Sequence, residues 1–320
     1  MPIKPARLSP GDTIAIVAPA SPPPDPKAID QSVDALKALG FRPKLARNVR
    51  QRHGFLAGTD RQRAADIMQA FADKKVNAIF CVRGGYGASR LLPLLDYQAI
   101  RNNPKIFIGY SDLTSLHCAL LKKSNLVSFH GPMLNSELIK SNQPQFTVEG
   151  MIRTLVTAVA AGSISESYDG GSVRVVRRGK ASGRLLGGNL SILCATIGTP
   201  YLPSFRNRIL FFEDLEEPPY RFDRMLTQLW NTGLLQQVAG IAVGINHNCI
   251  DPRAASAREY RQTLDDVLKE RLAPLKIPVV SGLPFGHVPH NATLPIGIRA
   301  TLDADVGQLL ITEPAVRPTD

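Results

Sequence analysis

The sequence has few cysteines, a single tryptophan and no long apolar run. The four cysteines, Cys81, Cys118, Cys194 and Cys249, are scattered without a CxxC pair, which argues against a disulfide framework or a zinc ribbon. No apolar run reaches the roughly 18 residues that a membrane span needs, so we predict no span. The amino-terminal residues lack the apolar core of a signal peptide, and we therefore expect a cytoplasmic protein.

The sequence has an excess of positive charge, with a formal net charge of +11 over 320 residues. This charge would suit an anionic partner such as nucleic acid or an acidic cell-wall fragment. Lysine and arginine are nevertheless spread along the chain, without a dense basic run or interleaved aromatic residues. We therefore expect a basic, solvated surface and no nucleic-acid partner. The length is sufficient for two domains and a large buried core.

The first half alternates strand-like and helix-like segments. Short apolar runs rich in β-branched residues predict strands, and apolar residues at helical spacing predict helices. The expected strands are 13–17, 41–45, 77–82 and 106–109, and the expected helices are 28–39, 60–71, 88–95 and one beginning at Leu113. This alternation predicts an α/β unit whose mostly parallel sheet is covered on both faces.

The second half has shorter and less regular signals, typical of a mixed α+β domain. Residues 135–145 are polar and are interpreted as a crossing loop, and a helix over 148–160 ends the first domain. The domains are therefore predicted at 1–160 and 161–320. The expected strands are 172–176, 209–212, 241–245 and 278–280, the expected helices are 189–197, 222–230 and 257–271, and a terminal β-hairpin pairs 293–302 with 308–312.

The stretch Gly109-Tyr110-Ser111-Asp112 joins an apolar strand to a helix. A serine on such a tight turn lies near the positive end of the following helix, where a nucleophile is well placed. The same position suits an ordinary helix cap, which Ser111 or Asp112 would supply. The turn alone favours the cap, because caps are common at the start of helices.

A glycine-rich turn, Arg83-Gly84-Gly85-Tyr86-Gly87, follows the preceding strand. It matches neither GxGxxG nor the Walker sequence, so a nucleotide site is weakly supported. Its backbone N–H groups would form an oxyanion hole together with the N–H of Asp112. The alternative is a turn in which glycine only supplies positive φ. Both turns follow the carboxyl ends of successive strands, where open α/β sheets bind ligands.

A hydroxyl nucleophile needs a base, and the base needs an acceptor that orients it. Of the six histidines, His287 lies in a Gly/Pro loop directly after a strand, where its ring can project into a cleft. His117 follows Ser111 on the same helix and is not expected to face it. His287 and His290 have HxxH spacing but no helix or glutamate between them, so we expect no metal site. Glu213 ends an apolar strand, where a carboxylate is costly unless it has a partner.

Six segments of the chain, in this order, resemble the LD-carboxypeptidases, a serine peptidase family that also includes the microcin C immunity peptidases. They are Val82-Arg83-Gly84-Gly85-Tyr86-Gly87-Ala88-Ser89-Arg90-Leu91-Leu92, Gly109-Tyr110-Ser111-Asp112-Leu113-Thr114, Phe129-His130-Gly131-Pro132-Met133, Gly187-Gly188-Asn189-Leu190, Glu213-Asp214 with Pro219-Tyr220-Arg221-Phe222-Asp223-Arg224-Met225-Leu226, and Gly282-Leu283-Pro284-Phe285-Gly286-His287. These segments extend over nearly the whole chain.

The resemblance implies a catalytic triad of Ser111, His287 and Glu213 that releases terminal D-alanine from the L,D bond of murein tetrapeptides in peptidoglycan recycling. It implies a first domain like that of class I glutamine amidotransferases, with a flavodoxin-like parallel sheet, and a second domain with a small β-barrel. It also implies a cytoplasmic homodimer without metal or other cofactor. Tyr110 stands where many relatives are expected to have histidine, which leaves substrate detail open.

Three residues near these turns are candidate substrate contacts: Arg83 for the terminal carboxylate, Tyr86 and Tyr110. Within the same chemistry, the alternative is an immunity peptidase that cleaves a peptidyl-nucleotide antibiotic, which needs an aromatic side chain to stack on a base. Trp230 lies in a helical apolar pattern and is predicted to be in the core instead. In a different class, the chain would be a non-catalytic module that binds a small ligand, and the triad geometry discriminates between these possibilities.

Overall fold

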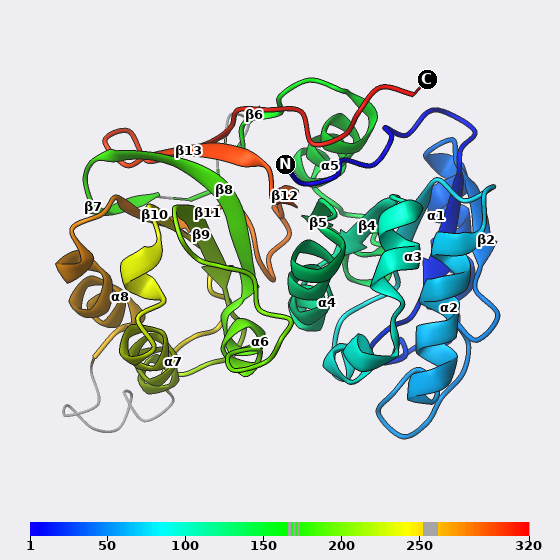
Figure 1. Cartoon of the computed structure of the whole chain (residues 1–320), viewed down its shortest axis with the longest axis horizontal. Helices are drawn as coiled ribbons and strands as arrows, with labels where there is room; N and C mark the ends of the chain where they lie inside the picture. The colour runs from blue at the N-terminus through cyan, green and yellow to red at the C-terminus, as the bar shows by residue number, and fades with distance from the viewer. Residues whose placement is uncertain (166–167, 169, 172, 252–261, 320) are drawn as a thin grey trace.

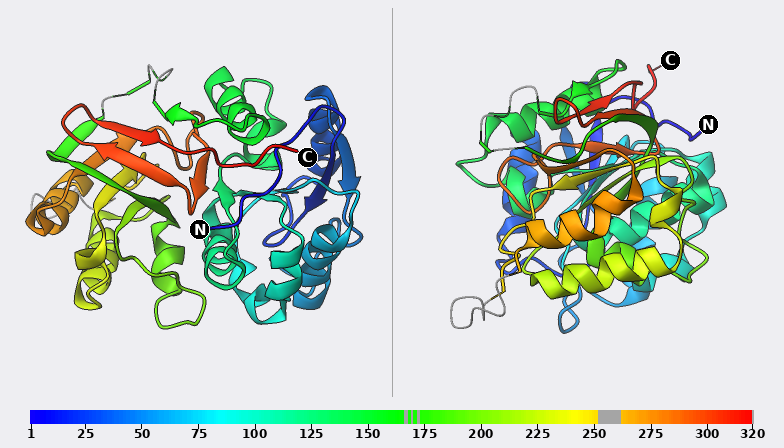
Figure 2. Two further views of the ribbon diagram at one scale, coloured as in Figure 1. Left: turned by 45° about the horizontal axis from the view of Figure 1, so that its top comes forward. Right: turned by 90° about the vertical axis from the view of Figure 1, so that its left-hand side faces the viewer.

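The computed structural model describes residues 1–165, 168, 170–171, 173–251 and 262–319. They form two sheets with flanking helices, and the two halves of the chain lie side by side (Figure 1; Figure 2, left). The mixed α/β class predicted from the sequence is confirmed. Among the described residues, no helix has the length and apolar character that crossing a bilayer requires.

The first sheet has six strands in the order β12-β5-β4-β3-β1-β2. Its strands are β1 (Thr13–Val17), β2 (Arg42–Leu45), β3 (Ala78–Cys81), β4 (Ile106–Gly109), β5 (Ser128–His130) and β12 (Leu294–Ile296). β1 to β5 are parallel, and β12 pairs antiparallel with β5. Because β3 and β4 are parallel neighbours, the loops after them emerge at the same edge of the sheet.

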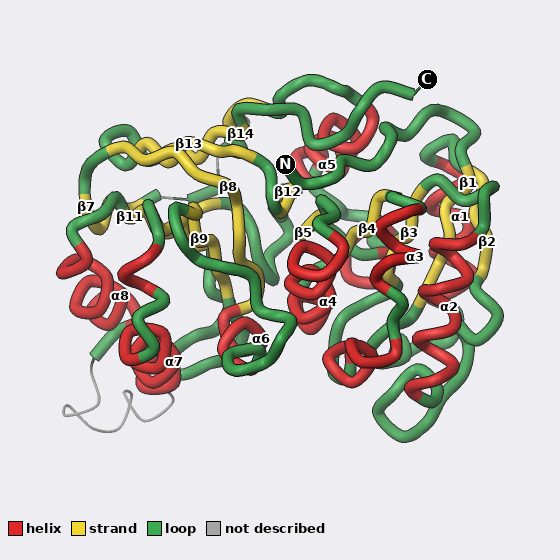
Figure 3. Tube along the Cα trace, viewed as in Figure 1, coloured by secondary structure: helices red, strands yellow, loops and turns green. Residues whose placement is uncertain are grey.

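Helices cover both faces of the first sheet (Figure 3). They are α1 (Ala28–Ala38), α2 (Asp60–Ala72), α3 (Tyr97–Asn102), α4 (Thr114–Ala119) and α5 (Gln145–Val156). Successive side chains of a strand point to opposite faces. Accordingly, Ile16 of β1 shares an apolar cluster with Leu36 of α1, whereas Val17 shares another with Ile67 of α2. The predicted parallel sheet with helices on both faces is therefore present.

The second sheet has eight strands in the order β6-β14-β13-β8-β9-β10-β11-β7. These are β6 (Gly162–Ser163), β7 (Arg174–Arg177), β8 (Lys180–Asn189), β9 (Arg208–Glu213), β10 (Gly240–Gly244), β11 (Val279–Leu283), β13 (Arg299–Asp303) and β14 (Gln308–Ile311), and the helices of this half are α6 (Leu190–Ala195), α7 (Pro219–Asn231) and α8 (Leu264–Leu272). β8 to β11 are parallel, so the residues after β9, β10 and β11 lie along one edge.

The predicted strand 293–302 is wrong, because the chain breaks there into β12 and β13, which lie in different sheets. Gly297 lies between them at φ +91°, a left-handed conformation that ends an extended strand and suits glycine. The hairpin that does form pairs β13 with β14. β12 thereby attaches the end of the chain to the first sheet, beside the edge strand β5.

Other predicted elements differ in extent. The polar segment 135–145 is not all loop, because a helical turn spans Leu134–Leu138. The predicted helix 148–160 begins earlier and ends at Val156, and the segment 88–95 is a 3-10 helix over Ala88–Leu94. Trp230 is 36% exposed at the end of α7, so its placement in the core is wrong. Residues 172 and 257–261 of two predicted elements lie outside the described residues.

Candidate active site

Ser111 lies on a sharp turn between β4 and α4. Its φ is +64°, a left-handed conformation that a non-glycine residue adopts at a cost of about 1–3 kcal/mol. Neither Ser111 nor Asp112 caps the helical turn that follows, so the cap alternative is wrong for both side chains. Instead, Oδ2 of Asp112 accepts a hydrogen bond of 2.7 Å from the N–H of Ala88. The Asp112 carboxylate thus connects this turn to the glycine-rich turn.

His117 supports the strand below this turn rather than facing Ser111. Its Nε2 lies 2.7 Å from the carbonyl oxygen of Gly109, and its Nδ1 lies 2.8 Å from Oγ of Ser128. The ring is fully buried, and burial lowers the pKa of His117 to about 4. His117 is therefore neutral near pH 7, and both of its ring nitrogens are already engaged.

The glycine-rich turn packs closely on two serines, because Gly84 lies against Ser111 and Gly85 lies against Ser21. A Cβ on Gly84 would lie 2.9 Å from Cβ of Ser111, so only glycine leaves room for the serine. Gly85 has φ +110°, and a Cβ there would lie 2.5 Å from Oγ of Ser21. Within the described residues, the N–H groups of Gly84 and Gly85 donate no hydrogen bond, and Gly84 is the glycine that lies beside Ser111.

Glu213 and His287 are brought together from distant parts of the sequence. Nδ1 of His287 donates to Oε2 of Glu213 at 2.6 Å, and Glu213, the last residue of β9, is fully buried. Burial opposes a charged imidazole, but the Glu213 carboxylate, with smaller contributions from Asp214 and Glu137, raises the pKa of His287 above its usual 6.5. A carboxylate in this position fixes the ring tautomer and leaves Nε2 free to exchange a proton.

The ring of Tyr110 joins this pair to the serine turn. It meets the ring of His287 edge to face, with centroids 4.8 Å apart, and Tyr110 directly precedes Ser111. No hydrogen bond among the described residues connects Ser111 with His287. Catalytic hydrogen bonds are often long without substrate and shorten when it binds. The structure therefore joins Glu213 to His287 and brings Tyr110, the neighbour of Ser111, against the His287 ring.

The predicted substrate contacts have different surroundings. Arg83 is half-buried, and its Nη1 donates to the carbonyl oxygen of Pro22 at 3.4 Å. Tyr86 is 51% exposed and packs against Phe55. Tyr110 is only 3% exposed, and its hydroxyl donates to Oε1 of Glu137 at 2.7 Å. Only Tyr110 of these three contacts the His287 ring in the described residues.

Sequence reasoning missed Glu137 and Lys140. Both line a cavity of about 310 Å³ that also borders Tyr110 and His287. Glu137 is 4% exposed, and burial raises its pKa to about 7. The sequence had one signal for it, because Glu137 lies between Leu134, Leu138 and Ile139, an unusual place for an acidic residue in a solvated loop.

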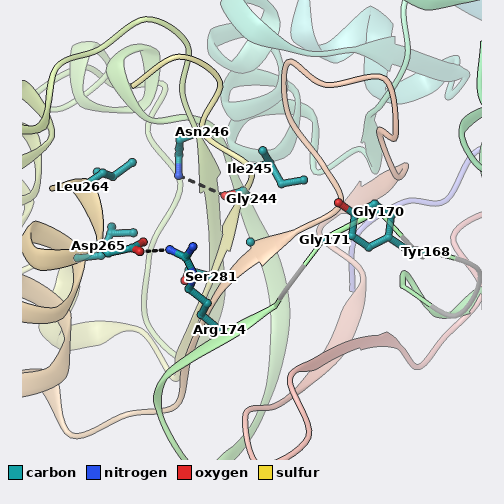
Figure 4. Close-up of a pocket in the computed structure, with 12 residues that line it drawn as sticks. Tyr168, Gly170, Gly171, Arg174, Gly244, Ile245, Asn246, Leu264, Asp265 and Ser281 are labelled. Carbon is teal, nitrogen blue, oxygen red and sulfur yellow. Dashed lines mark hydrogen bonds and ion pairs between the residues drawn. The ribbon is translucent and has the colours of Figure 1, made fainter. Parts of the chain in front are cut away.

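A second cavity of about 360 Å³ lies at the edge of the second sheet (Figure 4). Asn246, Ser281 and an ion pair between Arg174 and Asp265 contribute to its walls. None of its lining residues is Ser111, Glu213 or His287. His290 is likewise separate, because its ring packs against those of Phe146 and Tyr168. Among the described residues, no cluster of three or more metal-ligating side chains is present.

Family models match both halves of the chain. Residues 14–131 match the LD-carboxypeptidase N-terminal domain, and residues 182–302 match the LD-carboxypeptidase C-terminal domain. The chain belongs to the LD-carboxypeptidase family. This membership makes the protein a peptidase by family and confirms the resemblance seen in the six sequence segments.

Individual relatives agree with this assignment. The probable murein peptide carboxypeptidase of Bacillus subtilis is 38% identical over 300 residues, covering 94% of this chain and 91% of the relative. A crystal structure of muramoyltetrapeptide carboxypeptidase from Oxalobacter formigenes matches with a TM-score of 0.82 and 33% identity, covering 96% of this chain and 100% of that chain. A structure of MccF in complex with glutamyl sulfamoyl guanosine matches with a TM-score of 0.86 and 28% identity, covering 99% and 100%.

Proposed function

We propose that this LD-carboxypeptidase family member is a serine peptidase that releases terminal D-alanine from murein tetrapeptides. Ser111 is the nucleophile, His287 the general base and acid, and Glu213 the acceptor that orients His287. The observation that best supports this assignment is the 2.6 Å hydrogen bond between His287 and the buried Glu213, beside a serine held at positive φ. The murein-related names of the relatives support the choice of substrate.

The proposed reaction begins when Oγ of Ser111 attacks the carbonyl carbon of the residue before D-alanine. Nε2 of neutral His287 accepts the hydroxyl proton, and the resulting imidazolium is stabilised by Glu213. The N–H groups of Asp112, Gly84 and Gly85 stabilise the oxyanion. His287 then donates the proton to the D-alanine nitrogen as the C–N bond breaks.

The acyl-enzyme formed on Ser111 is then hydrolysed. His287, neutral again, accepts a proton from a water molecule that attacks the ester carbonyl. The tetrahedral intermediate collapses, and His287 returns the proton to Oγ of Ser111. The products are the shortened peptide with a new carboxylate and free D-alanine, and the enzyme is regenerated without a cofactor.

The setting of the enzyme follows from the same proposal. Peptidoglycan recycling places it in the cytoplasm, and we propose a homodimer with a peptide substrate and no nucleic-acid partner. We also propose the flavodoxin-like description for the first sheet, which its order β2-β1-β3-β4-β5 supports. The small β-barrel of the second half and the domain limits 1–160 and 161–320 remain predictions.

A substrate comparison tests the proposed function. Purified enzyme is offered, separately, a murein tetrapeptide ending in D-alanine and an aminoacyl sulfamoyl adenosine, and product formation is followed by mass spectrometry. We expect a kcat/KM for the tetrapeptide at least about 100-fold higher, because discrimination by several binding contacts readily exceeds ~2.7 kcal/mol. Preferential cleavage of the sulfamoyl compound would assign the protein to immunity chemistry instead.

A non-catalytic binding module is the less suitable alternative. A carboxylate that is fully buried against an imidazole costs desolvation energy, and a serine at φ +64° adds backbone strain. A module that only binds a ligand gains nothing from a buried carboxylate or from a strained serine. Both costs are expected where a nucleophile and its base must be held in position.

A further inference from the structure

The cavity of about 310 Å³ beside His287 has one wall from the segment after β5 and another from the His287 loop. The first wall includes Glu137, Lys140 and Gln143, and the second includes His287 and Pro289. We call this cavity the Lys140 pocket. Its lining includes the imidazole of the proposed triad but not Ser111, Gly84 or Asp112. The pocket therefore lies on the imidazole side of the site, and Tyr110, which directly precedes Ser111, is the part of the serine turn that borders it.

The two walls of the Lys140 pocket are held together by hydrogen bonds. Nε2 of Gln143 and Oγ1 of Thr147 both donate to the carbonyl oxygen of Pro289, at 3.2 and 2.6 Å. Oγ1 of Thr147 also accepts from the N–H of Asn291 at 2.9 Å. These contacts fix the distance between the Lys140 wall and the His287 loop, so the pocket exists before a ligand binds.

The two charged side chains of the pocket, Glu137 and Lys140, differ in whether they can still bind a ligand. Glu137 is buried and both of its oxygens are used, Oε1 by the hydroxyl of Tyr110 and Oε2 by the N–H of Met133, each at 2.7 Å. Burial also raises the pKa of Glu137 to about 7, so it is partly neutral near that pH. Lys140 is exposed and forms no salt bridge with an acidic side chain among the described residues, although its positive charge acts on Glu137 and opposes the effect of burial on the pKa of that carboxyl. The pocket thus offers an exposed cation to an anionic ligand.

Acyl-transfer chemistry decides which part of the substrate lies on this side. The imidazole that accepts the serine proton must later donate it to the leaving nitrogen, so the leaving residue lies next to Nε2 of His287. The carbonyl oxygen of the scissile bond lies in the opposite direction, toward the backbone donors. In a carboxypeptidase the leaving residue is the last of the peptide and has a free carboxylate.

We propose that the Lys140 pocket binds the leaving carboxy-terminal residue and that Lys140 pairs with its free carboxylate. This assignment rests on the proposed function, because it requires the scissile bond to precede the last residue. In this assignment Lys140, rather than Arg83, distinguishes a peptide with a free carboxylate after the scissile bond from a longer peptide that extends beyond that residue. The pocket's polar lining of Ser136, Asn142 and Gln143 suits a small zwitterionic product such as an amino acid.

The test uses two tetrapeptides that differ only at the carboxyl terminus, one with a free D-alanine carboxylate and one with D-alanine amide. The intact enzyme is expected to prefer the free acid. Lys140→Gln is expected to lower kcat/KM for the free acid about tenfold, mainly through KM, and to leave the amide nearly unchanged, because only the acid loses a charge-assisted contact. Lys140→Arg is expected to restore most of the preference.

Lys122→Gln provides the matched control, because Lys122 is an exposed lysine of the same half that does not line the pocket. It should leave both peptides unaffected. Equal losses on acid and amide in Lys140→Gln, or no loss on either, would overturn the assignment of the pocket while leaving the proposed function intact. Failure of the unmodified enzyme to cleave either peptide would overturn the proposed function and this assignment with it.

Discussion

Replacing Ser111 with alanine is expected to lower kcat/KM for the tetrapeptide by at least about 10⁴-fold, because the nucleophile is lost while the backbone donors remain. The release of D-alanine is measured by mass spectrometry over several enzyme concentrations. Residual activity from substrate binding and the oxyanion hole would still exceed the uncatalysed reaction. Ser111→Ala that retained a tenth or more of the activity would exclude Ser111 as the nucleophile.

Stability measurements distinguish the loss of the nucleophile from a destabilised Ser111 turn. Alanine keeps the Cβ of Ser111 and therefore the strain at φ +64°, so the free energy of unfolding should be nearly unchanged. Ser111→Gly provides the matched control: it should be equally inactive but about 1 kcal/mol more stable, because glycine adopts positive φ without strain. Urea unfolding of the three proteins measures this difference.

Glu213→Gln is expected to lower kcat/KM by about 10³–10⁴-fold, because the amide no longer favours the productive tautomer or the imidazolium of His287. It should also change the pH profile. His287 acts as a base only when neutral, so activity is lost as pH falls through its pKa. Since the Glu213 carboxylate raises the pKa of His287 above 6.5, removing that charge should move the acid limb of the residual activity to lower pH.

Glu216→Gln is the control for this charge change. Glu216 is exposed three residues after the end of β9, and no hydrogen bond among the described residues joins it to His287. We expect its kcat/KM and its acid limb to match those of the unmodified enzyme. If Glu213→Gln retained the original acid limb, Glu213 would not be the group that sets the protonation of His287.

Much of the first half was predictable from local sequence. The strands around Ile16 and Ile108 are short apolar runs, and the helix containing Ile67 has regular apolar spacing, so each element is specified by its own residues. The α/β alternation then indicated the parallel sheet. The carboxyl ends of its strands indicated where the turns of Gly84 and Ser111 would meet.

The parts that could not be predicted depend on contacts between distant segments. Glu137 falls in the polar segment 135–145 that was predicted to be a crossing loop, because its partners, the hydroxyl of Tyr110 and the N–H of Met133, become visible only in the fold. The chain breaks at Gly297, and β12, which precedes the break, pairs with β5, more than a hundred residues earlier in the sequence. No local pattern encodes such a pairing. Trp230 has helical apolar spacing but lies at the exposed end of α7.

The contact between Glu213 and His287 could be predicted from the sequence only in part. An acidic residue at the end of the apolar strand Arg208–Glu213 indicated that some partner was required. The Gly/Pro loop after a strand made His287 the candidate partner, and the family resemblance supported that choice, although the two residues are 74 positions apart. The structure adds the contact itself and the Tyr110 ring that connects it to the serine turn.

The most direct test of the account is the release of alanine from two tetrapeptides that end in D-alanine or L-alanine and are otherwise identical. Purified enzyme is incubated with each, and free alanine and the shortened peptide are quantified by mass spectrometry. We predict stoichiometric release of D-alanine from the first and no more than about 1% of that rate from the second, a discrimination of ~2.7 kcal/mol. Folded enzyme that leaves the D-alanine peptide intact would contradict the account.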